Sequence, residues 1–219
     1  MNILNRALTA GLLPVFDNTS TTSALTAMQM LVKCGIPAIE LAHRQPDSLE
    51  RFKELRKSIE CLGAGTITNA RDATKYLLAG AKFIVGPNFS AEVARLCYAA
   101  HVPYMPGFQT STEMYAAIDA GASALKFFPA GGQEKAFRHI KKAMPADLSQ
   151  MQFLASGGPS LYTATDWIRA GFDAIVLPQR ELAWSNPDEF NQLSEPVHSV
   201  LKQIETFKHK KSLPASATA

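Results

Sequence analysis

Short apolar segments recur along the chain about every 25 residues, and between them apolar and polar positions alternate at helical spacing. Several of these segments follow a small residue and a glycine at the end of the preceding helical stretch. Apolar runs of this length, bounded by turn residues, predict strands that are buried on both faces. Eight strands are expected within the segments LLPVF (12–16), CGIPAIEL (34–41), CLGAG (61–65), AGAKFIVGP (79–87), AHVPYMPG (100–107), AGASALKFFP (120–129), MQFLAS (151–156) and AGFDAIVLP (170–178).

The segments between the strands begin with residues that commonly start helices, such as Ser, Thr, Asn and Pro. We expect helices over 21–34, 48–60, 70–79, 91–100, 111–120, 133–143 and 161–170, and a final helix over 187–208. A further helix over 2–9 is expected to cap the bottom of the domain. The last residues, SLPASATA from 212, are expected to form a disordered tail.

Strands that alternate with single helices predict parallel strands joined by helical crossovers. Eight such units close into a (β/α)8 TIM barrel, which is the α/β fold that we expect. A doubly wound open sheet is the alternative, but it would leave edge strands, and all eight segments are apolar. A chain of 219 residues is long enough for one such domain, which we expect over 1–211, followed by the tail over 212–219.

Composition narrows the class of protein further. The chain is 47% hydrophobic and 19% charged with a formal net charge of +3, which is typical of a globular protein. No basic cluster is interleaved with aromatic residues, so we expect no nucleic-acid partner. No apolar stretch approaches ~20 residues, and the N-terminus lacks a signal-peptide pattern, so we expect no membrane partner and a cytoplasmic location. The three separated cysteines predict reduced thiols rather than disulfides or a metal site.

The segment ASALKFFPA contains a lysine, Lys126, where a doubly buried strand should be apolar. In a barrel, active-site residues come from the C-terminal ends of the strands. Alternation points Lys126 inward from the sixth expected strand and Glu40 inward from the second, so the two should face each other across the barrel. Taken alone, such a pair is more typical of a buried structural ion pair.

The neighbouring residues favour chemistry over a structural pair. A lysine that attacks a carbonyl must be neutral, and an apolar strand lowers its pKa by desolvation. Glu40 could carry the protons that such a reaction moves. Arg44 offers a fork for a carboxylate, and Thr66 offers a hydroxyl after a glycine turn. Alternation turns His43 away from Glu40, so we expect it to be structural.

The order and spacing of IELAHR, GAGT, VGPN, MPG, LKFFPA and SGG, over about residues 11 to 180, resemble the 2-keto-3-deoxy-6-phosphogluconate (KDPG) aldolases, also described as 4-hydroxy-2-oxoglutarate aldolases. The resemblance implies a homotrimeric class I aldolase without a metal or other cofactor. Its small-molecule substrate would be a 2-keto-3-deoxy (phospho)sugar acid or a related 4-hydroxy-2-keto acid, cleaved to pyruvate and an aldehyde. The implied roles are Schiff-base formation for Lys126, general acid/base catalysis for Glu40, carboxylate binding for Arg44 and Thr66, shaping of the pocket for Pro87 and Phe128, and phosphate binding for Gly157 and Gly158.

The sequence departs from this family after the eighth expected strand. The family pattern has a Gly-Ser pair there, and this chain has Leu177-Pro178-Gln179-Arg180. Pro178 has no N–H to donate to a phosphate, so half of the expected phosphate site is missing. Either Gln179 or Arg180 supplies side-chain donors instead, or the distal group of the substrate is not a phosphate.

Two other functions stay open at this point. A sugar-phosphate isomerase or epimerase could use Glu40 and Lys126 for proton transfer without a covalent bond. A non-catalytic relative that binds sugar acids could keep the barrel without turnover.

Overall fold

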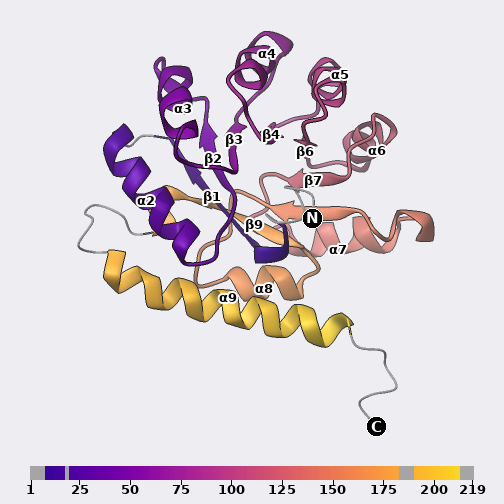
Figure 1. Ribbon diagram of the computed structural model, residues 1–219. Coiled ribbons are helices and arrows are strands. Elements are labelled where there is room, and N and C mark those ends of the chain that lie inside the picture. The colour runs from indigo at the N-terminus through magenta and orange to yellow at the C-terminus, as the bar shows by residue number, and fades with distance from the viewer. Residues whose placement is uncertain (1–7, 18–19, 183–189, 213–219) are drawn as a thin grey trace.

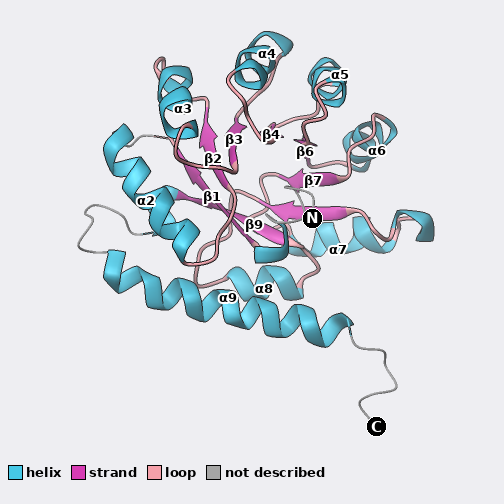
Figure 2. Ribbon diagram, viewed as in Figure 1, coloured by secondary structure: helices cyan, strands magenta, loops and turns pink. Residues whose placement is uncertain are grey.

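The computed structural model describes residues 8–17, 20–182 and 190–212. Its parallel strands lie at the centre, and helices surround them (Figure 1, Figure 2). The strands pair in the order β5-β4-β3-β2-β1-β9-β8-β7-β6. Their bounds are β1 Leu12–Phe16, β2 Ile39–Ala42, β3 Leu62–Gly65, β4 Ile84–Val85, β5 Tyr104–Met105, β6 Gly107–Phe108, β7 Ala124–Phe127, β8 Gln152–Ala155 and β9 Ala174–Pro178.

The strands at the two ends of this order, β5 and β6, are the two halves of the fifth expected strand. Pro106 separates β5 from β6, and because proline has no N–H, the hydrogen-bonding ladder is interrupted there. The first half pairs with β4 and the second with β7, and the Lys126 N–H donates to the Pro106 carbonyl at 2.9 Å. The sheet therefore closes on itself. The predicted (β/α)8 barrel is confirmed, and the open-sheet alternative is wrong.

The crossover helices follow the sequence signals closely at their starts. In α2, α4, α5 and α6, the side chains of Ser20, Asn69, Ser90 and Thr110 accept a hydrogen bond from the third residue of the helix. The helices are α2 Thr21–Lys33, α3 Ser48–Arg56, α4 Ala70–Leu78, α5 Ala91–Ala99, α6 Ser111–Asp119, α7 Glu134–Lys142, α8 Ala164–Arg169 and α9 Phe190–Ser212, with short 3-10 turns η1 Ala146–Leu148 and η2 Gln179–Leu182.

All seven predicted crossover helices are longer than the observed ones, five of them by only one or two residues and two by four. The helix expected over 48–60 ends at Arg56, where the chain turns toward β3. The helix expected over 161–170 begins only at Ala164, because Ser160 and Thr163 bond to each other's backbone N–H and hold the preceding residues in a turn.

Residues 8–10 and helix α9 meet at the bottom of the barrel. Residues 8–10 are helical, and the rest of the helix expected over 2–9 lies outside the described residues. Helix α9 extends to Ser212, four residues past its expected end, and the remaining tail, 213–219, is not described. Figure 1 shows α9 running alongside α8. From α9, Lys208 Nζ donates to the carbonyls of Leu8 at 2.6 Å and Asp173 at 2.7 Å.

The core divides into two apolar clusters. One lies between the strands and the helices and contains the stacked rings of Phe137 and Phe172. The other fills the barrel and includes Val15, Ala124, Leu154 and others from inward positions. The inward cluster forms an apolar floor beneath the C-terminal mouth. In the part of the chain that the structure describes, no helix has both the length and the apolar character that crossing a membrane requires.

Candidate active site

Lys126 lies inside the barrel on β7, between Gly107 of β6 and Leu154 of β8. Its side chain is 6% exposed, and Nζ lies 5.1 Å from the centre of the Phe128 ring. Burial lowers the pKa of this amine; the Glu40 carboxylate opposes that effect, and the Arg44 guanidinium adds to it. The surroundings therefore favour the neutral amine, which is the nucleophilic form.

Glu40 lies inside the barrel on β2 and is 3% exposed. Burial raises the pKa of its carboxyl, while Lys126 and Arg44 oppose the rise. The carboxyl occupies the space over Gly65 of β3, where the Cβ of any other residue would overlap Oε1. Gly65 is thus what allows Glu40 to point into the mouth.

Glu40 and Lys126 act on each other electrostatically without forming an ion pair. Glu40 Oε2 is buried with no hydrogen-bond partner, and no described carboxylate lies within 4.0 Å of Lys126 Nζ. Buried ionisable groups in structural roles are normally paired, because leaving them unpaired is costly. An unpaired acid and an unpaired amine facing one interior are more typical of a catalytic site.

Arg44 lies just beyond β2, and its half-exposed guanidinium is held by Asp17. Arg44 Nη1 donates to Asp17 Oδ2 at 2.7 Å, and Arg51 Nη1 donates to the Asp17 carbonyl at 3.2 Å. Asp17 is not among the site residues expected from the sequence. It directly follows β1, so the rule that barrel active sites gather at strand C-termini could have found it.

Thr66 and Pro87 border the mouth after β3 and β4. Thr66 has φ +60°, a left-handed conformation that β-branched residues rarely adopt and that is concentrated at functional sites. The Pro87 carbonyl occupies the space in front of Gly107, where a Cβ would overlap it. Because Gly107 pairs with Lys126, Pro87 lies close to the strand that carries the amine.

Phe128, Gly157 and Gly158 form the side of the mouth after β7 and β8. A Cβ on Gly157 would lie 2.9 Å from the Phe128 ring, and one on Gly158 would lie 2.5 Å from Gly131. Both glycines have positive φ, +70° and +155°, and the Gly131 N–H donates to the Gly157 carbonyl at 2.8 Å. Among the described residues, the N–H groups of Gly157 and Gly158 have no acceptor, so they can donate to a ligand.

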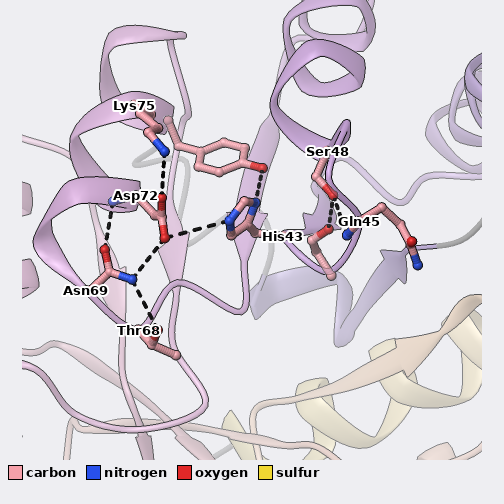
Figure 3. A network of polar contacts seen from close by, with 9 residues as sticks. His43, Gln45, Ser48, Thr68, Asn69, Asp72 and Lys75 are labelled. Atoms are coloured by element: carbon pink, nitrogen blue, oxygen red, sulfur yellow. Dashed lines mark hydrogen bonds and ion pairs between the residues drawn. The ribbon is translucent and has the colours of Figure 1, made fainter.

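His43 belongs to a separate network outside the barrel interior (Figure 3). Its Nδ1 lies 3.0 Å from the Tyr76 hydroxyl, and its Nε2 lies 3.7 Å from Asp72 Oδ2. Asp72 is held in turn by Asn69 at 2.9 Å and Lys75 at 3.0 Å. The network joins β2 to α4 and includes neither Lys126 nor Glu40, as expected for a structural histidine.

The structure brings all eight candidate residues to one end of the barrel. Lys126 and Glu40 face its interior, and Arg44, Thr66, Pro87, Phe128, Gly157 and Gly158 follow the strands that surround them. In the described ranges, no three His, Cys, Asp or Glu side chains gather as they would around a metal ion.

Comparison with known proteins gives a consistent result. The family model described as KDPG and KHG aldolase matches residues 3–179. A 2-dehydro-3-deoxy-phosphogluconate aldolase of Treponema pallidum is 29% identical over 86% of this chain and 92% of its own. The crystal structure of a 4-hydroxy-2-oxoglutarate/2-dehydro-3-deoxyphosphogluconate aldolase from TTHB1 is 31% identical, with a TM-score of 0.79 over 92% of this chain and 99% of that one.

A more distant solved structure shares the fold. The KDPG aldolase of Legionella pneumophila, with pyruvate captured as a covalent carbinolamine intermediate, is 19% identical. Its TM-score is 0.74 over 90% of this chain and 96% of that one.

Proposed function

Because the chain belongs to the KDPG and KHG aldolase family, we propose that its barrel cleaves a 4-hydroxy-2-keto acid through a Schiff base on Lys126. The products are pyruvate and an aldehyde. This proposal rests on one observation. Lys126 and Glu40 are both buried and face the same barrel interior, and they form no ion pair with each other. The opposite shifts of their pKa values favour a neutral nucleophile beside a proton carrier.

The reaction follows from the chemistry of these two groups. The neutral Lys126 amine adds to the C2 carbonyl of the keto acid. The carbinolamine takes a proton from the Glu40 acid as it loses water, which gives a protonated imine and the Glu40 carboxylate. The Glu40 carboxylate takes the proton of the C4 hydroxyl, and the C3–C4 electron pair moves into the imine as the aldehyde leaves. The resulting enamine takes a proton back at C3 from Glu40. Water then adds to the protonated imine and releases pyruvate and the neutral amine, and the proton set free returns to the Glu40 carboxylate.

The remaining residues position the substrate in this proposal. Arg44 binds the carboxylate next to C2 through the guanidinium nitrogens that Asp17 does not occupy, and Thr66 donates its hydroxyl to the same group. Pro87 and Phe128 form apolar walls near Lys126. The N–H groups of Gly157 and Gly158 meet a polar group at the distal end of the substrate.

Neither alternative function explains the site as well. An isomerase would need a proton carrier, but it would not need a desolvated amine that is kept out of an ion pair. A protein that only binds sugar acids would gain nothing from two buried, unpaired ionisable groups.

An assay of pyruvate release tests the proposed function. We expect the wild-type protein to release pyruvate from a panel of 4-hydroxy-2-keto acids, and Lys126→Ala to lower kcat/KM at least ~1,000-fold because no imine forms. Lys142→Ala, on the exposed face of α7, is the control and should match the wild type. Turnover by Lys126→Ala at the wild-type rate would refute the proposal.

We also propose that a single domain over 1–211 assembles as a homotrimer in the cytoplasm. Leu78 at the end of α4 and Tyr98 near the end of α5 are 85% and 80% exposed on neighbouring helices, which suits an interface between copies. The three cysteines are buried and form no disulfide, which fits a reducing compartment. Sedimentation equilibrium should give three times the chain mass of 23.8 kDa.

A further inference from the structure

The place of the Arg44 guanidinium decides how well it can bind the carboxylate of a keto acid, the role that the proposed function gives it. An arginine side chain is long and rotates freely, so ordering it against a ligand costs conformational entropy. The Arg44 side chain is 49% exposed, so packing alone does not hold it. Its polar contacts therefore decide whether the guanidinium is in place before a substrate arrives.

The backbone that carries Arg44 is fixed by a buried hydroxyl. Ser48, the first residue of α3, is 1% exposed. Its Oγ accepts a hydrogen bond from the Gln45 N–H at 2.9 Å and donates one to the Ala42 carbonyl at 3.4 Å (Figure 3). The Arg44 N–H donates to the same carbonyl at 3.0 Å. The loop between β2 and α3 is thus closed on itself, and only the side-chain torsions of Arg44 remain to be set.

Asp17 holds the end of that side chain. Its Oδ2 accepts a hydrogen bond from Arg44 Nη1 at 2.7 Å, the short end of the range for charge-assisted bonds. β1 and β2 pair with Phe16 opposite Leu41, so the loops after these strands begin side by side. Arg51 of α3, 9% exposed, donates from Nη1 to the Asp17 carbonyl at 3.2 Å. The carboxylate that holds Arg44 therefore belongs to a residue whose own backbone is anchored.

The ion pair contributes little to the stability of the fold, because the Asp17 and Arg44 side chains are 35% and 49% exposed. It uses one of the three guanidinium nitrogens of Arg44. In the part of the chain that the structure describes, Arg44 Nε and Nη2 have no acceptor. Their N–H groups remain available to a carboxylate, which an arginine can bind through two parallel hydrogen bonds.

The guanidinium that Asp17 holds lies at the same mouth as the reacting groups. Burial is the main cause of the pKa shifts of Lys126 and Glu40, and their attraction for each other comes next. The Arg44 charge then lowers the pKa of both groups. A cation that acts on both is at the mouth where the carboxylate next to the reacting C2 carbon has to be bound.

Asp17 also carries a negative charge, which repels a substrate carboxylate. Because both members of the ion pair are partly exposed, water and salt screen that repulsion. Screening does not remove the entropy that is saved when the arginine is already ordered. The positioning effect of Asp17 should therefore exceed its repulsion.

We propose that Asp17 is a positioning residue of the carboxylate site. It holds the Arg44 guanidinium so that the N–H groups that Asp17 does not use receive the carboxylate of the keto acid. Asp17 acts through Arg44 and does not touch the substrate. The inference rests on the proposed function, because Arg44 has this role only in a site that binds keto acids.

Steady-state kinetics of pyruvate release test the inference. Asp17→Ala should raise KM about 5-fold to 10-fold, the cost of ordering one freed arginine side chain, and leave kcat within ~2-fold. The carboxylate is bound alike in the ground state and the transition state, so the loss appears in KM alone. Asp17→Asn keeps an acceptor in the same place, so its KM should lie closer to that of the wild type than to that of Asp17→Ala. Glu54→Ala, which removes the exposed Glu54–Lys57 pair of α3, is the matched control and should change neither value.

A double-mutant cycle with Arg44→Ala separates positioning from a structural role. If Asp17 acts through Arg44, Asp17→Ala should raise KM no further in the Arg44→Ala background. A purely structural role would raise KM by the same factor in both backgrounds, and that result would overturn the inference. An unchanged or lowered KM in Asp17→Ala would also overturn it, as would a KM in Asp17→Asn as high as that in Asp17→Ala.

Trapping with borohydride at increasing concentrations of pyruvate, which has the carboxylate but no distal group, is run in parallel. The half-saturating pyruvate concentration should rise in Asp17→Ala by the same factor as KM. If the wild type is trapped and Asp17→Ala shows the same half-saturation, only the role of Asp17 fails. If no pyruvate is trapped on the wild type, the proposed function itself fails.

Discussion

The amine of Lys126 and the carboxyl of Glu40 share a barrel interior that disfavours charge on either group. Burial lowers the pKa of the amine and raises that of the acid, and each group opposes the shift of the other. The sequence was enough to find both residues, because a lysine in a buried strand is unusual and strand alternation fixes the side on which it points. It did not reveal the Asp17–Arg44 ion pair, because that contact joins two loops whose paths depend on tertiary structure.

The pH dependence of imine formation with pyruvate reports the environment of Lys126. The ammonium form cannot attack, so the rate should rise with pH and level off above an inflection that lies below the ordinary lysine pKa of ~10.4. The Glu40 carboxylate stabilises the ammonium, so Glu40→Gln should move the inflection to lower pH. Stopped-flow measurement of the rate of imine formation between about pH 5 and about pH 10 includes this inflection and shows both effects. An upward movement in Glu40→Gln would contradict this assignment of charges.

Gly65 is predicted to matter through the space that it leaves for Glu40. In Gly65→Ala, the added Cβ would overlap Glu40 Oε1 and displace the carboxyl, so we expect kcat to fall about 100-fold while imine formation with pyruvate persists. Gly121→Ala is a suitable control, because that glycine has φ +87° but nothing within 4 Å of the added Cβ. The control should lose stability through backbone strain and keep its kcat. Equal kcat values in the two variants would show that the space over Gly65 has no catalytic role.

For the helices and strands, the spacing of apolar residues and the capping residues predicted the eight strand–helix units. Local contacts, which the spacing does not show, decide where each helix or strand ends. The break at Pro106 could have been read from the sequence as a loss of one ladder hydrogen bond. The late start of α8 depends on side-chain bonds between Ser160 and Thr163, which compete with the helix and are not visible as a period. Boundaries of this kind shift an element by a few residues without moving the site.

Lys208 of helix α9 makes hydrogen bonds to the bottom of the barrel. Its Nζ donates to the carbonyl of Leu8, which precedes β1, and to the carbonyl of Asp173, which directly precedes β9. Lys208→Met would leave these carbonyls without their charged donor, so we expect the free energy of unfolding to fall by ~2–4 kcal/mol. The KM of the cleaved substrate should not change, because the site is at the other end of the barrel. Urea denaturation measures the loss, with exposed Lys202→Met of the same helix as the matched control.

An effect of Lys202→Met as large as that of Lys208→Met would mean that charge on α9, rather than the carbonyl contacts, stabilises the barrel. A raised KM in Lys208→Met would mean that the floor and the mouth are coupled.

For the whole molecule, the internal repeat was the feature of the sequence that allowed the fold to be predicted. Once eight strand–helix units are recognised, closure into a barrel follows, and closure alone gathers the candidate residues at one mouth. The direction of each pKa shift required the structure, because it depends on how deeply each group is buried and on which charges face it. The loop after β9 stood out in the sequence as a departure, but the buried acceptor of Gln179 appeared only with the packing around it.

The central claim is that the Lys126 amine forms the covalent bond with the keto acid. Incubating the intact protein with pyruvate and borohydride, followed by mass spectrometry of its peptides, tests this directly. We expect one reduced pyruvyl group per chain, on the peptide that contains Lys126, and none in Lys126→Ala. An unmodified wild-type chain, or an adduct on another lysine that persists in Lys126→Ala, would contradict it.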